Sequence, residues 1–290
     1  MKELNISVKN YYQLTKPGII YGNALTAIGG FLLAAKGHVQ PSLFFGMLAG
    51  TCLVIASACV FNNFIDRSID IKMARTKKRA LVTGLISGRI ALIYATTLGV
   101  VGFILLITLT NILTVLIGLI GFIFYVVVYG IGKRKSVHGT IIGTIPGAAP
   151  IVAGYCAVTG RFDLGAAILF FIMVFWQMPH FYGIALARLK DYRAAGIPLL
   201  PVKRGAEVTK RQMLFYVVGF ILSTTALTIS GYSGYTFAIV MGLMGLYWLV
   251  RGTMEYRKYT DEIWGKKMFL RSLATLLLFS FMLSISVVLP

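Results

Sequence analysis

The sequence predicts an all-α integral membrane protein, built as a bundle of nine transmembrane helices. Hydrophobic residues make up 58% of the 290-residue chain, whereas charged residues make up only 13%. A soluble protein of this length would need more polar surface to cover its core, so the composition favours a membrane protein. No linker or low-complexity tract divides the chain. We therefore expect residues 1–290 to form a single intramembrane domain.

Nine apolar runs are long enough to cross a bilayer as helices. Each contains 18 to 24 residues, which matches the roughly 20 residues that a spanning helix needs. The runs lack the alternating pattern that is typical of the strands of outer-membrane barrels. They fall at about 18–36, 42–64, 88–108, 111–131, 139–159, 164–187, 211–230, 233–250 and 268–289.

The basic residues predict the orientation of these spans. With a cytoplasmic N-terminus, 26 of the 28 Lys and Arg residues lie on the cytoplasmic side, and only Lys36 and Arg161 lie opposite. This distribution follows the positive-inside rule. It also explains the net charge of +19 without a nucleic-acid partner, because basic loops face anionic lipids. Nine spans then place Pro290 on the side opposite the N-terminus.

Two cytoplasmic connections, after the second and sixth spans, are longer than the others at about 23 residues each. Both begin at an apolar helix end, carry an acid early, contain several cations and close on a short apolar segment, at 80–84 and 197–202 respectively. The similarity recurs after four spans and is compatible with two related halves. Long connections in a compact protein are more often functional than incidental.

A polar stripe marks the cytoplasmic end of the second span. Asn62, Asp66 and Asp70 recur every four residues and would share one helix face. Mg²⁺ in proteins is usually held by one or two carboxylates, with phosphate oxygens and waters completing its shell. The stripe and the cations after it predict a site for a Mg²⁺-bound diphosphate with an apolar tail. These cations are Arg75, Lys77, Lys78 and Arg79.

The simplest alternative for Asp66 and Asp70 is a solvated helix end. Three features favour the metal site: the chain has only nine acids, cations follow the stripe at once, and a third acid, Asp191, ends the matching sixth span. No acid falls in the middle of a span. A proton pump or cation-coupled transporter would therefore have no carriers within the membrane.

The stripe and its surroundings resemble the first signature of the UbiA-type intramembrane prenyltransferases. The resemblance covers most of the chain, and its second part points to the branch of this family that modifies haem. One departure is that the second long connection offers Asp191 alone, where relatives with aromatic acceptors commonly carry an Asp-x₃-Asp-like repeat. The matching segments are Asn62-x₃-Asp66-x₃-Asp70, Met73-x-Arg75-Thr76-x₂-Arg79-x-Leu81-Val82, Lys133-Arg134, Gly143 to Pro150, Gly154 to Gly160, Pro179-His180-Phe181 and Asp191-Tyr192-x₂-Ala195-Gly196-Ile197-Pro198-x₂-Pro201-Val202.

This resemblance implies an enzyme that joins a farnesyl group from farnesyl diphosphate, plus water, to a vinyl group of haem b, releasing diphosphate. The product, haem O, would serve haem-copper terminal oxidases. The implied partners are therefore membrane lipids and a haem A synthase or an oxidase assembly partner. The implied location is the bacterial cytoplasmic (inner) membrane, with the active site near the cytoplasmic face. The implied catalytic and Mg²⁺-binding residues are Asn62, Asp66, Asp70 and Asp191. The implied substrate-binding residues are Arg75, Lys77, Arg79, Lys133, Arg134, His180 and Lys190.

The intramembrane histidine, His180, follows the helix-bending Pro179. A hydrogen-bonded packing role is the common one for such a residue, and the resemblance adds iron ligation or orientation of the acceptor. His138, with Lys133 and Arg134, could meet haem propionates or simply form an interfacial basic cluster. A dry pocket must also protect the allylic cation. Its candidate aromatic residues, which could equally be ordinary packing residues, are Phe61, Phe64, Tyr125, Tyr129, Phe175 and Trp176.

Two other functions remain open from the sequence. A related enzyme that prenylates an aromatic acid or a quinone precursor would share the first signature and differ in the second long connection. A transporter of lipid-linked or organic anions would show a similar basic mouth and internal repeat. It would have no need for the stripe of Asn62, Asp66 and Asp70.

Overall fold

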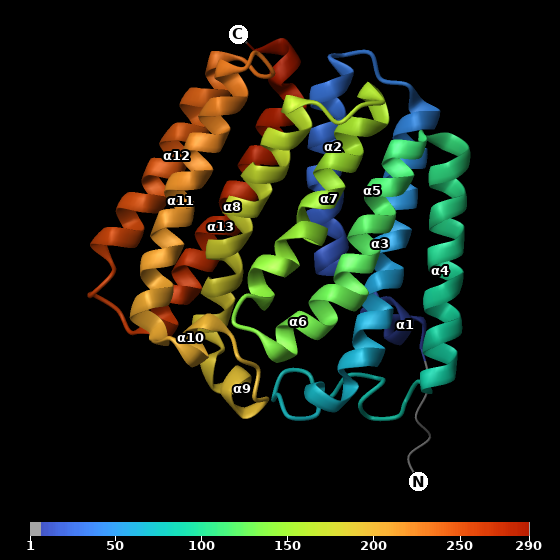
Figure 1. Ribbon diagram of the computed structural model, residues 1–290, viewed down its shortest axis with the longest axis vertical. Coiled ribbons are helices and arrows are strands. Elements are labelled where there is room, and N and C mark those ends of the chain that lie inside the picture. The colour runs from blue at the N-terminus through green and yellow to red at the C-terminus, as the bar shows by residue number, and fades with distance from the viewer. Residues whose placement is uncertain (1–6, 290) are drawn as a thin grey trace.

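The computed structural model describes residues 7–289 and shows a bundle of long α-helices (Figure 1). Within that range, nine helical segments are long and apolar enough to cross a membrane, which confirms the predicted fold class. The predicted positions of Lys2 and Pro290 lie outside the described residues. The spans are α2 (Pro17–Ala35), α3 (Pro41–Asp70), α4 (Gly88–Leu109), Ile112–Lys135, α7 (Gly139–Thr159), α8 (Leu164–Ala187), α11 (Gly205–Ile229), α12 (Tyr235–Met254) and α13 (Asp261–Ile285).

Several helices continue beyond the apolar runs at the end that the sequence predicts to be cytoplasmic. Helix α3 has 30 residues, a length of about 45 Å, whereas the hydrocarbon core is about 30 Å thick. Its last turns therefore project beyond the apolar layer and keep the polar stripe on a helix as far as Asp70. For the same reason α11 begins at Gly205 and α13 at Asp261, about six residues before the apolar runs that predicted them.

The fourth span is not a uniform helix. It consists of α5 (Ile112–Ile123), a π-helical turn η1 (Phe124–Val128) and α6 (Tyr129–Lys135). Such turns often occur at functional sites. Helices α7 and α8 continue through their prolines, which are Pro146 and Pro150 in α7 and Pro179 in α8, as membrane helices often do.

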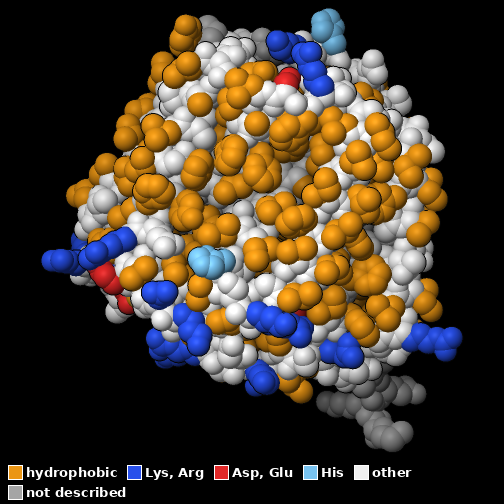
Figure 2. Space-filling view, in the orientation of Figure 1, with side chains coloured by type: hydrophobic (Ala, Val, Ile, Leu, Met, Phe, Trp, Pro, Cys, Tyr) orange, Lys and Arg blue, Asp and Glu red, His pale blue; other side chains and the backbone are white. Residues whose placement is uncertain are grey.

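The two long connections meet at one end of the bundle (Figure 1). Residues 71–87 lie there beside α1 (Val8–Leu14), α9 (Leu189–Ala194) and α10 (Leu200–Lys203). In Figure 2 most of the Lys and Arg side chains on the visible face gather at this end, and apolar side chains cover the face above them. The surface therefore has the division into apolar and basic zones that a membrane protein of this orientation requires.

Helices α2 and α7 pack through small residues in the middle of the bundle. A Cβ atom added to Gly154 of α7 would lie 2.1 Å from the carbonyl oxygen of Ala27, and one added to Gly30 of α2 would lie 2.2 Å from that of Ile151. Backbone groups cannot move aside as a flexible side chain can. The two helices therefore need glycine at both positions, as is common where membrane helices approach closely.

Replacing Gly154 by valine is expected to destabilise the protein by about 3 kcal/mol, the upper end of the usual cost of overpacking, because the added side chain must separate two backbones. The thermal unfolding midpoint in detergent, followed by circular dichroism, measures the effect. Gly242→Val on α12 is the matched control, since a Cβ atom at Gly242 would meet nothing within 4 Å. Equal midpoints for the two variants would contradict the close packing of α2 on α7.

Candidate active site

A cavity of about 680 Å³ opens at the end of the bundle that carries the long connections and extends between the helices. Its volume is within the usual range for small-molecule sites. The polar stripe of α3 lines its mouth, and residues of α2, α7, α8 and α13 line its inner part. An amphipathic molecule with a charged head and an apolar tail matches this division.

The predicted stripe faces the cavity. Asn62, Asp66 and Asp70 all line it, and their exposed fractions are only 2%, 8% and 3%. The four-residue spacing on a continuous helix produces this common direction. Buried carboxylates require compensating charge or hydrogen bonds, so their partners define the chemistry of the mouth.

Cations from distant segments supply this compensation for Asp66. Lys133 Nζ forms a short ion pair with Asp66 Oδ2, and Arg134 Nη2 lies 3.1 Å from Asp66 Oδ1. Arg134 also donates to the carbonyl oxygen of Ile65, at 2.7 Å. Both cations come from the last turn of α6, which the fourth span brings back to this end. The sequence-predicted pair Lys133 and Arg134 thus reaches the stripe.

The first long connection folds back onto the stripe through Arg79. Its Nη1 atom lies 2.6 Å from Asp70 Oδ2 and 3.0 Å from Asn63 Oδ1. Thr76 supports this return by donating to the carbonyl oxygen of Asp70, at 2.8 Å. Arg79 and Arg75 both line the cavity. The predicted diphosphate ligands of the first connection are therefore placed at the mouth, with the exception of Lys77, which is exposed and does not line it.

The second long connection contributes a tyrosine in place of the predicted acid. Tyr192 lines the cavity and accepts a hydrogen bond from Arg75 Nη2, at 3.4 Å. Asp191 and Lys190 are absent from the lining. In the described part of the chain, no three His, Cys, Asp or Glu side chains come together as a metal site. The structure therefore does not bring Asp191 to Asp66 and Asp70.

Sequence reasoning missed Lys16, the residue before the first span. Its Nζ atom donates to Asn62 Oδ1 at 2.7 Å, and the residue lines the cavity. Burial lowers the pKa of Lys16 to about 8. Its backbone is in the left-handed region, with φ of 54°, which is uncommon for a residue with a side chain. A lysine directly before Pro17, at the predicted cytoplasmic end of a span, was the available signal.

Aromatic side chains divide into two groups. Three of the six predicted ones, Tyr125, Tyr129 and Trp176, line the cavity. Tyr125 lies within the π-helical turn and Tyr129 is the first residue of α6; their rings stack with centroids 5.7 Å apart. The other three pack elsewhere: Phe61 against Phe122, Phe64 under Arg67, and Phe175 against Tyr216. For these three the packing role is the observed one.

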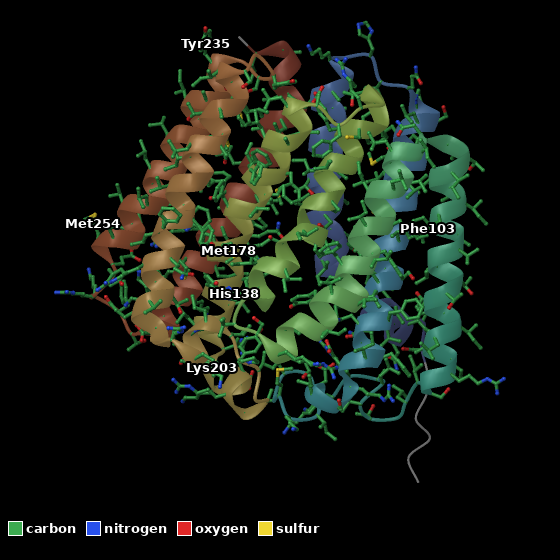
Figure 3. All side chains as sticks on the ribbon, in the orientation of Figure 1. Phe103, His138, Met178, Lys203, Tyr235 and Met254 are labelled. Carbon is green, nitrogen blue, oxygen red and sulfur yellow. The ribbon has the colours of Figure 1, made fainter. Side chains whose placement is uncertain are left out.

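The two histidines named from the sequence have different surroundings. His180 lines the inner cavity, and its ring lies 4.8 Å from that of Trp176 in a stacked arrangement. His138 is exposed at the start of α7 (Figure 3) and does not line the cavity. It follows Lys133 and Arg134 closely in sequence, yet only those two reach the stripe. The structure therefore separates His138 from the group.

The donor set at the mouth fits a hard divalent cation. Two carboxylates and one carboxamide oxygen are the ligand types that Mg²⁺ prefers, and all three lie on one face of α3. Within residues 7–289, the amide nitrogen of Asn62 is buried without a hydrogen-bond partner. Its oxygen accepts a hydrogen bond from Lys16 Nζ at 2.7 Å, so the oxygen is the atom that faces the cations at the mouth.

A helix bundle with acids and cations at the mouth of a largely apolar cavity fits an intramembrane enzyme that acts on a lipid diphosphate. The chain belongs to the UbiA prenyltransferase family, whose sequence profile matches residues 23–276. It is similar to the protoheme IX farnesyltransferase of Sodalis glossinidius (strain morsitans), with 51% identity over 98% of this chain and 96% of that protein. It is also similar to protoheme IX farnesyltransferase 2 of Pseudomonas fluorescens (strain Pf0-1), with 50% identity over 98% of this chain and 97% of that protein.

Solved structures share the fold at lower identity. A structure described as digeranylgeranylglyceryl phosphate synthase superimposes with a TM-score of 0.78 at 18% identity, covering 97% of this chain and 98% of the other. A UbiA homologue from Archaeoglobus fulgidus, bound to GPP and Mg²⁺, gives a TM-score of 0.72 at 16% identity, covering 95% and 99%. The chain is thus a multi-pass membrane protein with the UbiA fold.

Proposed function

We propose that this chain is a protohaem IX farnesyltransferase that converts haem b and farnesyl diphosphate to haem O and diphosphate, with addition of water. The observation that supports this most is the buried stripe of Asn62, Asp66 and Asp70, facing cations at the mouth of an apolar cavity. The 50–51% identity to the two named relatives directs the choice of acceptor toward haem. The reaction is a prenyl transfer, in which the diphosphate leaves as an anion.

The mouth of the cavity would hold the diphosphate. Mg²⁺, when bound by Asn62, Asp66 and Asp70, would supply positive charge that stabilises the departing diphosphate. Arg79 and Lys133 lie directly against the same carboxylates. They can therefore hold phosphate oxygens with charge-assisted hydrogen bonds. Asp191, Lys77 and Lys190 stay as outer contributors that a substrate-bound mouth would have to recruit.

The inner cavity would protect the farnesyl cation from bulk water. Apolar walls exclude water, and the faces of Tyr125, Tyr129 and Trp176 can stabilise positive charge. The haem acceptor would then approach from the side of His180. The mouth lies at the end of the bundle where basic residues gather, which supports an active site near the cytoplasmic face of the bacterial inner membrane. Haem O would pass on to a terminal oxidase, directly or after further oxidation by a partner enzyme.

A single product measurement tests this function. Purified protein in detergent, mixed with haem b, farnesyl diphosphate and Mg²⁺, is expected to yield a porphyrin heavier by one farnesyl group and one water. Omission of Mg²⁺ is expected to suppress the product. If a quinone precursor is prenylated instead and haem is returned unchanged, the alternative acceptor is correct. If neither acceptor changes mass, the prenyl-transfer function is wrong.

A further inference from the structure

Two hydrogen-bond acceptors on α8 border the inner cavity, the carboxamide oxygen of Gln177 and Nε2 of His180. Both residues line the cavity, and a separation of three residues makes them neighbours on one helix face. Among the residues that the structure describes, neither of these atoms has a hydrogen-bond partner. The other polar atoms of both side chains are already engaged, which fixes what each can still bind.

Gln177 presents only its oxygen to the cavity. Its Nε2 atom donates to the carbonyl oxygens of Thr144 and Met173, both at 3.0 Å. Because both partners are acceptors, they identify the nitrogen and use both of its hydrogens. The oxygen lies against Gly147, where an added Cβ atom would be only 1.8 Å away. The side chain is 2% exposed, so the acceptor has a fixed position in the cavity wall.

His180 presents an unprotonated nitrogen because of Ser272. The Ser272 hydroxyl donates its single hydrogen to the carbonyl oxygen of Phe269, at 2.5 Å. At its 2.8 Å contact with His180 Nδ1 the hydroxyl oxygen must therefore accept, so Nδ1 carries the proton. In the neutral ring Nε2 then has a free lone pair. Trp176 steadies the ring by stacking on it and by donating from Nε1 to the Ser272 carbonyl oxygen, at 2.8 Å.

We propose that Gln177 and His180 hold the water molecule that the reaction consumes, and that Ser272 is the positioning residue for His180. This inference rests on the proposed function. A water molecule offers two hydrogens, which match the two fixed acceptors of Gln177 and His180. A phosphate or carboxylate group, which has only acceptors, does not match them. The pair thus admits one nucleophile to a part of the cavity that must otherwise stay dry.

The resulting step balances. The diphosphate leaves with the electron pair of the bond to the farnesyl carbon, and the terminal vinyl carbon of haem forms a bond to that carbon. The positive charge then rests on the vinyl carbon attached to the porphyrin. The oxygen of the held water forms a bond to this carbon, and one water proton passes to Nε2 of His180. Gln177 keeps the second water hydrogen oriented, so that a lone pair of the oxygen faces the cation.

The test measures how the product partitions between hydrated and dehydrated forms. In water labelled with a heavy oxygen isotope, His180→Phe is expected to lower the hydrated share of farnesylated haem about 100-fold, the usual size of a general-base contribution. Gln177→Leu should lower it about tenfold, as for the loss of one hydrogen bond. The missing fraction appears as a porphyrin lighter by one water, because the cation loses a proton instead.

Ser272→Ala distinguishes positioning from packing. It removes one hydroxyl and retains His180. The hydrated share is expected to fall about tenfold, because the His180 ring can then adopt either tautomer and Nε2 is no longer always unprotonated. Met178→Leu is the control, because Met178 is buried on the same helix (Figure 3) and does not line the cavity.

An unchanged hydrated share in Gln177→Leu and His180→Phe would overturn the proposal. A changed absorption spectrum of bound haem in His180→Phe would overturn it too, by assigning Nε2 to the iron. A failure of the proposed function itself would show in the unaltered protein as no farnesylated haem.

Discussion

Asp66→Asn and Asp70→Asn are each expected to lower farnesyl transfer about 1000-fold, an effect at the upper end of those seen when one charge-stabilising group is removed. Each change keeps the shape of the side chain but removes a negative charge from the proposed Mg²⁺ site. Each change also leaves a cation without the negative charge of its carboxylate partner. That cation is Lys133 in Asp66→Asn and Arg79 in Asp70→Asn. Rates of diphosphate release at saturating farnesyl diphosphate, over a range of Mg²⁺ concentrations, measure the loss.

Two further measurements serve as controls for the predicted effect of Asp66→Asn and Asp70→Asn. Glu207→Gln removes an acid in the first turn of α11 that pairs with the exposed Arg211 and should keep full activity. Thermal midpoints in detergent show whether the Asp66 variant is folded, because Lys133 is buried and loses its partner. Near-normal rates in folded Asp66→Asn and Asp70→Asn proteins would show that these residues do not form the metal site. An equal loss of activity in Asp191→Asn would show that Asp191 belongs to the site as well.

The sequence predicts those features of the site that depend on local spacing. Asn62, Asp66 and Asp70 belong to one helix, so a four-residue period is enough to place them on one face. Apolar runs and the distribution of Lys and Arg predict the spans and their direction for a similar reason, since each span is a separate unit in the membrane. Arg79 could also be expected at the mouth, because its connection returns to the helix that it leaves.

The remaining features of the site depend on tertiary packing, which cannot be predicted from a local sequence pattern. Lys16 reaches Asn62 across 46 positions, and Ser272 reaches His180 across 92. The repeat between the two long connections predicted that Asp191 would face the stripe. The structure instead turns its neighbour Tyr192 toward Arg75, and both Asp191 and Tyr192 belong to the short helix α9. A π-helical turn likewise has no sequence signal, and it sets the register of Tyr125 and Tyr129.

Substitution of Arg79 is expected to have the second large effect, on the binding of farnesyl diphosphate. Its guanidinium bonds to Asp70 and Asn63 and also lines the cavity, so it both holds an acid in place and faces the diphosphate. Arg79→Met is expected to weaken binding of farnesyl diphosphate about 100-fold, as for the loss of a hydrogen bond between charged groups. Arg79→Lys should recover only part of this, because an ammonium group lacks the planar fork that contacts two acceptors at once.

Binding of farnesyl diphosphate in the presence of Mg²⁺, followed by calorimetry, separates this role from a general loss of positive charge. Arg89→Met removes an exposed cation at the start of α4 that does not line the cavity, and its affinity should equal that of the unaltered protein. A graded order, with Arg89→Met unaffected, Arg79→Lys intermediate and Arg79→Met weakest, requires a specific guanidinium contact. Equal losses in Arg79→Met and Arg89→Met would mean that the basic surface attracts the diphosphate only through its total charge, and that Arg79 serves solely to neutralise Asp70.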